Sequence, residues 1–266
     1  MRRGANLGDT APSFPGATSV TLLDVYEDVG PDGLCGGSPH MHLASTECYV
    51  VIGGRGALHT VAPTGARETE LCEGSVVWFT PGTIHRAVNH GDLKVLVIMG
   101  NAGLPEAGDA VMTFPAEIVA DPERYAVAAT LPQESSAARA AAASRRRDLA
   151  VEGFLVIRDA AVAGDVGPLR AFHAAAAALV RERAASWSDI VERGPAVQAA
   201  RSLDITRALA HGDAPHLSAA AVSAAPQPTG ERSFGMCGRL RAYDVGDAAV
   251  ALTSRRADAG TLPLLG

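Results

Sequence analysis

Short apolar runs alternate with turn residues over the first part of the chain. The runs occupy residues 20–26, 48–52, 56–61, 75–79 and 93–99, and Gly, Pro and Asp separate them. Short strands at a spacing near ten residues are typical of an all-β barrel or jelly roll. We therefore expect a barrel over residues 19–104, preceded by an extended arm at residues 1–18, which are rich in Gly, Pro and Ala.

The pattern changes beyond this region, where alanine and arginine become frequent. We expect helices in three segments: 134–150, 168–183 and 187–193. The whole stretch from 105 to 232 contains few large apolar residues. We therefore expect this helical extension to pack on the barrel or across a dimer interface instead of forming a core of its own.

Strand character returns near the end of the chain. The runs 233–243 and 248–253 flank residues 244–247, which suit a hairpin turn. We expect residues 233–266 to form a β-hairpin that packs on the barrel or on a partner subunit. The expected fold class is mainly β: a jelly-roll barrel with a C-terminal, mostly α-helical extension and a terminal β-hairpin.

Composition and charge narrow the range of partners. The chain has 266 residues, a formal net charge of -6 and no long basic run, which argues against nucleic acid as a partner. Its apolar runs are shorter than the ~20 residues of a membrane span, and no apolar segment follows the basic start Met1-Arg-Arg. The four cysteines lack Cys-x-x-Cys spacing and are too sparse for a disulfide scaffold. We expect a cytoplasmic protein.

Two segments contain residues that a small barrel would bring together. His40 and His42 lie two positions apart, so on a strand their side chains point to the same face. Glu47 follows after enough residues for a tight bend, and an adjacent antiparallel strand would return its carboxylate beside the histidines. His85 comes from a separate strand–turn–strand unit whose turn contains a Pro-Gly pair.

This set of side chains predicts a metal site. Three imidazoles and one carboxylate suit one divalent first-row metal ion, with iron foremost and manganese, nickel, zinc or cobalt as alternatives. Four ligands leave open positions on a six-coordinate ion, where water, oxygen or substrate can bind. We expect one such ion per chain.

The two segments resemble the paired motifs of the cupin superfamily. In the first motif, His40, His42, Glu47 and Gly54 fit the register of the His-x-His pair, the glutamate and the closing glycine. Leu34 stands at the position of the opening glycine, with Gly36 and Gly37 close by.

The second motif is matched at four positions: Gly74, Gly82, His85 and Asn89. Thr80 stands where a proline is expected, and Pro81 follows it directly. The resemblance covers roughly residues 20–100 and implies a metal-binding cupin of the three-histidine, one-glutamate type with a small-molecule substrate in the barrel. It also implies a homodimer, because cupin barrels commonly pair through their sheets.

Other residues near the motifs are candidates for shaping the pocket or moving protons. Tyr49 shares strand parity with Glu47 and is expected to face inward, and both it and His59 are candidate catalytic groups beside Glu47. Trp78 is a candidate apolar wall of the pocket, although core packing is a competing interpretation for it and for Tyr49. Arg86 would bind an anionic substrate if it reached the barrel mouth, but strand alternation indicates that it points away.

Three functions are compatible with such a site. The first is a mononuclear oxygenase or dioxygenase acting on a small organic substrate beside the metal, because cupins with this ligand set include dioxygenases. The second is a redox-neutral isomerase, decarboxylase, cyclase or hydrolase, in which the metal stabilises developing oxyanion charge as a Lewis acid. The third is a non-catalytic ligand-binding cupin. The fold does not decide among them, since one barrel hosts many chemistries.

Overall fold

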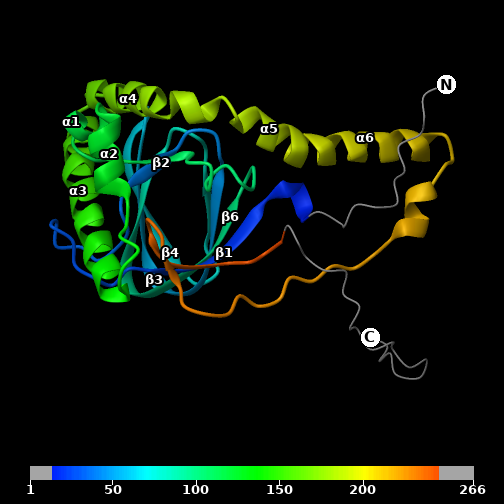
Figure 1. The fold of residues 1–266 in the computed structure, drawn as a ribbon, viewed down its shortest axis with the longest axis horizontal. Helices are drawn as coiled ribbons and strands as arrows, with labels where there is room; N and C mark the ends of the chain where they lie inside the picture. Colours follow the sequence, from blue (N-terminus) through cyan, green and yellow to red (C-terminus); the bar gives the residue numbers. More distant parts are fainter. Residues whose placement is uncertain (1–13, 246–266) are drawn as a thin grey trace.

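A computed structural model describes residues 14–245, in which one antiparallel sheet rolls into a barrel with helices along its left side and across its top in the view of Figure 1. The strands are β1 (Ser19–Val25), β2 (His40–His42), β3 (Glu47–Ala62), β4 (Gly65–Cys72), β5 (Val76–Phe79), β6 (Ile84–Met99), β7 (Ala110–Met112), β8 (Ser233–Phe234) and β9 (Gly238–Ala242). The α-helices are α1 (Ala116–Val119), α2 (Pro122–Ala129), α3 (Ser136–Val162), α4 (Gly167–Ala184), α5 (Trp187–Val191) and α6 (Val197–Ala210). Three short segments complete the fold: the 3-10 turns η1 (Pro15–Ala17) and η3 (Pro215–Ala219) and the π-helical segment η2 (Glu192–Ala196).

Two long strands, β3 and β6, hold the barrel together. They pair along most of their length, with register shifts between Val51 and Gly56 that bend the sheet. At Gly56 a Cβ atom would lie 2.1 Å from the carbonyl oxygen of Val88, so only glycine allows the strands to approach this closely. The separate runs expected at 48–52 and 56–61 are thus two halves of one bent strand.

The core consists of two clusters of buried apolar side chains. One lies inside the barrel and includes Leu23, Tyr49 and Val95. The other lies between the barrel and the helices, where Met41 of β2 packs in a cluster with Phe154 of α3. The helical extension shares this second cluster with the barrel and therefore packs on it.

The helix α3 lies very close to the end of strand β7. A Cβ atom on Gly153 would lie 2.1 Å from the carbonyl oxygen of Thr113, and the Thr113 hydroxyl donates to the carbonyl of Ala150 at 2.8 Å. This contact fixes the segment that follows β7. Strand β7 pairs with β2, so the barrel sheet extends beyond the expected boundary at residue 104.

The terminal hairpin is present, but its turn lies earlier than expected. Strand β9 pairs with β1 and adds the hairpin to the barrel sheet. The expected single strand 233–243 is divided, because the amide of Gly235 donates to the carbonyl of Gly238 at 2.8 Å and closes the turn there. The expected second strand at 248–253 and most of the expected arm, residues 1–13, lie outside the described residues.

No helix within residues 14–245 combines the length and the apolar content needed to cross a membrane.

Candidate metal centre

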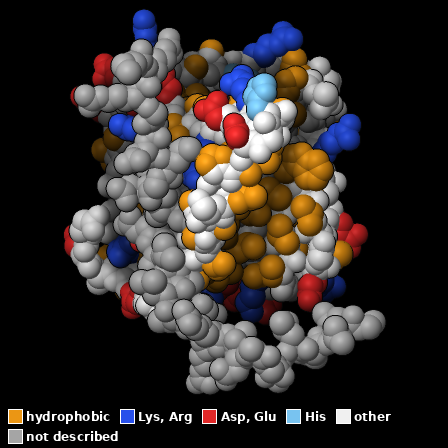
Figure 2. Space-filling model, turned by 90° about the vertical axis from the view of Figure 1, so that its right-hand side faces the viewer, with side chains coloured by type: hydrophobic (Ala, Val, Ile, Leu, Met, Phe, Trp, Pro, Cys, Tyr) orange, Lys and Arg blue, Asp and Glu red, His pale blue; other side chains and the backbone are white. Residues whose placement is uncertain are grey.

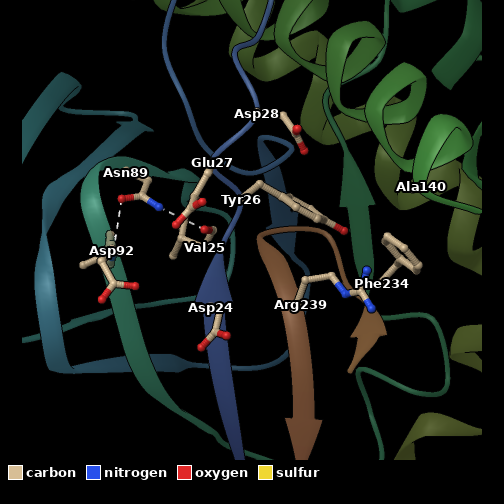
Figure 3. A pocket seen from close by; sticks show the side chains of 11 residues that line it. Asp24, Val25, Tyr26, Glu27, Asp28, Asn89, Asp92, Ala140, Phe234 and Arg239 are labelled. Atoms are coloured by element: carbon tan, nitrogen blue, oxygen red, sulfur yellow. Dashed lines mark hydrogen bonds between the residues drawn. The ribbon is translucent and has the colours of Figure 1, made fainter. Parts of the chain in front are cut away.

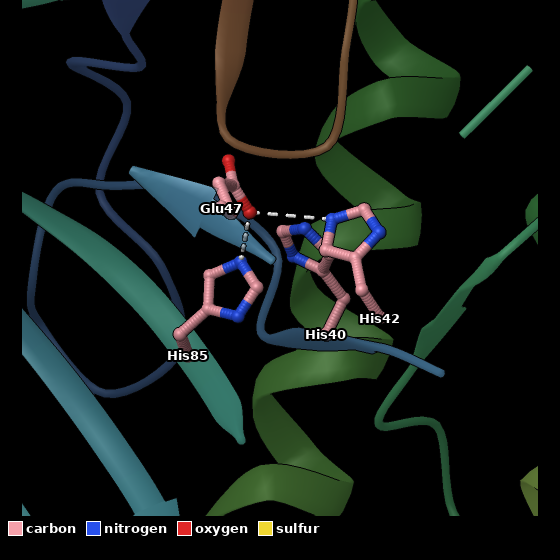
Figure 4. Close-up of side chains that lie close together, drawn as sticks. All are labelled: His40, His42, Glu47 and His85. Atoms are coloured by element: carbon pink, nitrogen blue, oxygen red, sulfur yellow. Dashed lines mark ion pairs between the residues drawn. The ribbon is translucent and has the colours of Figure 1, made fainter. Parts of the chain in front are cut away.

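Four side chains converge inside the barrel at the positions predicted from the motifs (Figure 4). His40 and His42 come from β2, Glu47 begins β3 and His85 lies on β6. Their ligand atoms all lie within 4.8 Å of one another, and the four side chains are buried. His40 and His85 are directly paired across β2 and β6, so backbone pairing places imidazoles from two distant segments side by side.

Hydrogen bonds fix the orientation of each imidazole ring. Nδ1 of His40 lies 2.9 Å from the carbonyl oxygen of Ser38, and Nδ1 of His85 lies 3.2 Å from that of Thr83. Nδ1 of His42 lies 3.3 Å from a carboxylate oxygen of Asp109. Because each Nδ1 faces an acceptor, each Nε2 is left as the atom able to bind a metal ion.

Asp109 was not predicted from the sequence. Its side chain is fully buried, and its two carboxylate oxygens accept hydrogen bonds from the backbone amides of Leu43, Ala44 and Ser45 as well as facing His42. The residue therefore holds both a ligand ring and the bend between β2 and β3. Nothing in the local sequence indicates this role, since Asp109 lies 67 residues from His42.

The protonation states follow from burial and from the close charges. Burial and the neighbouring rings His85 and His42 hold the pKa of His40 well below its usual value, so this ring is neutral. Burial alone would raise the pKa of Glu47, but the nearby His85 and His42 outweigh it and lower the pKa far below the usual value. Burial would lower the pKa of His42, but its contacts with Asp109 and Glu47 raise it to about 9.

Two buried atoms of the cluster, Oε2 of Glu47 and Nε2 of His85, make no well-aligned hydrogen bond within the described residues. Oε2 of Glu47 lies 3.2 Å from Nε2 of His42 and 3.1 Å from Nε2 of His85. Leaving buried polar atoms without a hydrogen bond costs roughly 1–3 kcal/mol each. A divalent cation among these atoms would satisfy them, so the residues present fit a metal ion.

A cavity of about 140 Å³ opens beside the cluster and includes His40, His42 and Glu47 in its wall. The remaining wall is mostly apolar and comes from β1, β6, the loop after β6 and the terminal hairpin: Ser19, Thr21, Leu23, Val97, Met99, Pro105, Glu106, Met236, Cys237 and Leu240. The hairpin therefore belongs to the site, which its position in the sequence did not indicate.

Trp78 does not form the apolar wall proposed for it. It is 69% exposed on the outer face of β5, where it pairs with Cys48. Because side chains alternate along a strand, the next residue, Phe79, points inward, and its ring centroid lies 4.2 Å from that of His85. The sequence interpretation therefore chose the wrong one of two neighbouring residues. The pairing of β5 with β3 decides which side chains of β5 face into the barrel, and the sequence does not show that pairing.

Arg86 does not reach the barrel mouth. Its side chain is fully buried on the opposite face of β6 from His85, where it forms an ion pair with Asp32. Its Nε donates to the carbonyl of Gly37 at 3.1 Å and one Nη donates to that of Leu34 at 3.3 Å. Arg86 therefore holds the loop that leads into β2 instead of binding a substrate.

His59 also lies on the wrong face for the proton transfer proposed for it. It pairs with Arg86 across β3 and β6, and its Nε2 lies 3.1 Å from a carboxylate oxygen of Glu68 on β4. This is the face away from His85. His59 is therefore separated from the cluster by the sheet itself.

Tyr49 points into the barrel, as its parity with Glu47 predicted. It is fully buried, its ring centroid lies 6.5 Å from that of His85, and its hydroxyl lies 3.3 Å from Sγ of Cys237. Burial raises the pKa of the tyrosine well above its usual value and that of the Cys237 thiol to about 12, so both groups are neutral. A catalytic role for Tyr49 stays a prediction.

The asparagine of the second motif has a structural role (Figure 3). The side-chain amide of Asn89 donates to the carbonyl of Val25 at 3.0 Å, and its oxygen accepts from the amides of Gly91 and Leu93. Asn89 also lines a larger surface cleft of about 380 Å³, which contains none of the four cluster residues.

Comparison with known proteins supports the cupin interpretation of the barrel. Residues 10–119 match a family model described as Cupin. The comparison with curated proteins found no match.

Among solved structures, the chain is similar to an uncharacterised protein with a double-stranded β-helix domain from Klebsiella pneumoniae. The identity is 20%, the match covers 39% of this chain and 84% of that one, and the TM-score is 0.27. The capsular polysaccharide assembling protein CapF from Staphylococcus aureus shows 21% identity over 31% of this chain and 22% of its own, with a TM-score of 0.24. The TDP-fucose-3,4-ketoisomerase WlaRA from Campylobacter jejuni shows 10% identity over 34% and 64%, with a TM-score of 0.28.

Proposed function

We propose that this chain, whose residues 10–119 match a family model described as Cupin, is a mononuclear metal-dependent enzyme, and specifically an oxygenase acting on a small organic substrate. The observation that carries the proposal is the convergence of four buried ligand atoms within 4.8 Å beside a cavity. A set of three imidazoles and one carboxylate with adjacent free space is typical of metal sites that perform chemistry instead of stabilising a fold.

The ion would be held by His40, His42, Glu47 and His85. We propose iron(II), with manganese, nickel, zinc or cobalt as alternatives, since nitrogen and oxygen donors of this kind suit each of them. When bound, such an ion supplies open coordination positions for a substrate and for oxygen. The protein's own part is to keep His40 neutral and Glu47 ionised, as their pKa shifts favour, so that both can act as ligands.

The small number of proton-transfer groups in the described cavity wall favours an oxygenase over a redox-neutral enzyme. Apart from the four cluster residues, the titratable side chains in the described wall are Glu106, which is exposed, and Cys237, whose pKa is raised to about 12. Isomerases and hydrolases commonly rely on a positioned acid or base whose pKa lies near the working pH. An oxygenase has less need of one, because the metal ion supplies most of the chemistry.

The size and polarity of the cavity limit the substrate. About 140 Å³ accommodates a molecule of only a few non-hydrogen atoms. The walls formed by Leu23, Val97 and Met99 are apolar, whereas Ser19 and Thr21 offer hydroxyl groups. We propose a short organic molecule with one polar group at the metal and an apolar body against these walls.

The first experiment is metal analysis of the purified chain after anaerobic reconstitution with iron(II), with His42→Ala as the test variant and His90→Ala as a matched control. His90 is exposed and outside the cluster. We expect about one iron per chain in the wild type and the control, and a large loss in His42→Ala. Nitric oxide, used as a probe for an open coordination position, should bind the iron-loaded wild type and give the corresponding electron paramagnetic resonance signal.

Oxygen uptake then separates the reaction classes. A panel of small carboxylates, thiols and alcohols is screened with the iron-loaded chain, and a substrate-dependent uptake that His42→Ala lacks supports the oxygenase. Turnover of a panel member without oxygen uptake would place the chain among redox-neutral enzymes. Failure to bind any of the proposed metals after reconstitution would contradict the enzyme proposal and favour a ligand-binding module.

We also propose a cytoplasmic setting for this reaction. The cysteines of the described residues, Cys35, Cys48, Cys72 and Cys237, are all free thiols. This is the usual state of cysteine in a reducing compartment.

A further inference from the structure

One carboxylate in the wall of the cavity beside the metal centre does not belong to the four-residue cluster. Glu106 lies in the loop between β6 and β7 and lines the cavity together with three of the cluster residues. Glu106 is exposed, whereas the cluster is buried. Its side chain therefore lies on the solvent side of the cavity, which we call the mouth, and the cluster lies at the inner end.

Contacts on both sides of Glu106 hold its loop in place. Leu104 is fully buried, and its carbonyl accepts a hydrogen bond from the amide of Asp109 at 3.1 Å. The carbonyl of Ala107 accepts a hydrogen bond from the indole nitrogen of Trp187 at 3.2 Å. Because the backbone is fixed before and after Glu106, a ligand that binds its carboxylate pays little for ordering the loop.

The negative charge of Glu106 has no counter-charge in the described wall. Among residues 14–245, the wall contains no lysine or arginine, and Glu106 forms no ion pair. Burial raises the pKa of Cys237 to about 12, so this thiol is uncharged. Ser19 and Thr21 add hydroxyl oxygens that can accept hydrogen bonds. The mouth therefore favours a positively charged group with N–H donors and disfavours a negatively charged one.

The inner end of the cavity has the opposite sign when the metal site is filled. With a divalent ion bound by three neutral imidazoles and one carboxylate, this end carries a net charge of about +1. A molecule with an anionic group at one end and a cationic group at the other is complementary to both ends of the cavity. The apolar side chains of Leu23, Val97 and Met99 share the wall and suit a short alkyl chain.

We propose that Glu106 determines specificity and that the substrate is a short aliphatic amine whose other end carries an anionic, metal-binding group. The carboxylate of Glu106 accepts hydrogen bonds from the ammonium group at the mouth. The cavity of about 140 Å³ limits the chain between the two groups to a few carbon atoms. This inference rests on the proposed function, because it requires the small-molecule site beside the ion.

The test compares two ligands of equal size, β-alanine and butyrate. Both have a carboxylate for the ion, but β-alanine carries an ammonium group where butyrate has a methyl group. The full chain is loaded with cobalt(II), whose visible absorption changes when a ligand enters its coordination shell. Titration gives the two dissociation constants, and their ratio reports the contribution of the ammonium group. Glu106→Gln removes the charge at constant size, and Glu73→Gln, in the exposed turn between β4 and β5, is the matched control.

The absorption of the ion reports only ligands that bind at the metal centre. This matters because butyrate could also associate with apolar surface elsewhere. Figure 2 shows hydrophobic side chains gathered on one outer face of the molecule, and Trp78 on β5 is 69% exposed. Binding at such places leaves the cobalt absorption unchanged, so it does not enter the ratio.

We expect the ratio of the butyrate dissociation constant to that of β-alanine to fall about fivefold in Glu106→Gln, the upper end for a solvent-exposed pair of charges. The ratio should stay unchanged in Glu73→Gln. Raising the salt concentration to about 1 M shortens the screening length to about 3 Å. This should lower the ratio of the wild type but leave that of Glu106→Gln nearly constant.

The outcomes separate this inference from the proposed function. If both ligands bind the ion but Glu106→Gln leaves their ratio unchanged, the role of Glu106 is wrong and the proposed function stands. The same holds if Glu73→Gln lowers the ratio as much, or if the amino group of β-alanine binds the ion itself, since that preference would survive Glu106→Gln. If the cobalt absorption responds to neither ligand, the ion has no open position for a carboxylate, and both proposals are overturned.

Discussion

Nδ1 of His42 lies 3.3 Å from Oδ2 of Asp109, a residue 67 positions further along the chain. The same carboxylate accepts three backbone amides from the segment that joins β2 to β3. A carboxylate behind a ligand histidine fixes the ring orientation and makes its other nitrogen a stronger donor to a metal. Asp109 is therefore a positioning residue for the candidate metal centre.

Replacing Asp109 with asparagine tests this role. The amide oxygen, placed at the Oδ1 position, can still accept the backbone amides of Leu43 and Ala44, but the Ser45 amide loses its acceptor and the negative charge behind His42 is lost. We expect metal affinity to fall by about 10–100-fold, the usual effect of changing such a group, with little change in the circular dichroism spectrum. Competition between the protein and a chelator for cobalt(II) measures the affinity. Asp121→Asn, at the exposed N-terminus of α2, is the control and should leave the affinity unchanged.

Removing the ligand side chains should have graded effects. His42→Ala and His85→Ala each remove one imidazole from the four-ligand cluster, and we expect both to lose most of the bound metal while the barrel stays folded, because these side chains line a cavity or its edge. Glu47→Gln keeps an oxygen donor and should weaken binding less. Elemental analysis and far-ultraviolet circular dichroism check these outcomes. Full metal occupancy in all three variants would show that the ion binds elsewhere.

The ligands could be predicted from the sequence because their geometry is local. His40 and His42 share a face through strand alternation alone, and His85 follows a turn with a recognisable composition. Asp109 and Cys237 could not be predicted, because both reach the site only through long-range pairing: β7 with β2, and β9 with β1. The inward position of Phe79 instead of Trp78 has the same cause, since the pairing of β5 with β3 decides which residue faces in.

Some elements of the fold could likewise be predicted from the sequence, and others could not. Evenly spaced apolar runs indicated the barrel, and alanine-rich segments indicated α3 and α4. The helix α6 was not predicted, because Val197–Ala210 has no buried residue that would mark an apolar face. A helix with few contacts to the rest of the described residues leaves little pattern in the sequence. The hairpin turn at Gly235 was also not predicted. Residues 244–247 are more polar, and their composition favoured a turn at that later position.

The ion pair between Arg86 and Asp32 should contribute to stability in a pH-dependent way. Arg86 is fully buried, whereas Asp32 retains slight contact with solvent. Burial would raise the pKa of Asp32, but its hydrogen bonds and charge interaction with Arg86 lower the pKa below 3.8. The stabilisation is therefore fully present above pH 3.8 and is lost as the pH falls through the folded-state pKa.

Replacing Asp32 with asparagine leaves the Arg86 charge buried without its partner. We expect the free energy of unfolding at pH 7 to fall by about 3 kcal/mol, at the lower end for breaking a buried pair because Asp32 lies near solvent. The difference between wild type and variant should shrink as the pH falls below 3.8. Urea unfolding at both pH values measures it. Asp204→Asn removes an exposed pair with Arg207 and should have little effect; a difference for Asp32→Asn that does not change with pH would contradict the assignment.

A variant of Tyr49 can distinguish a packing role of this side chain from a catalytic one. Its hydroxyl contacts Sγ of Cys237, its ring packs edge-on against Phe79, and it is absent from the wall of the cavity. Tyr49→Phe keeps the ring and removes only the hydroxyl, so we expect full metal occupancy and a loss of about 1 kcal/mol in the free energy of unfolding, as for one buried hydrogen bond. Cys237→Ser serves as the companion variant, because it changes the other partner of the same contact. If Tyr49→Phe keeps its metal and its stability but loses substrate-dependent oxygen uptake more than tenfold, the hydroxyl acts in the reaction and the packing role is wrong.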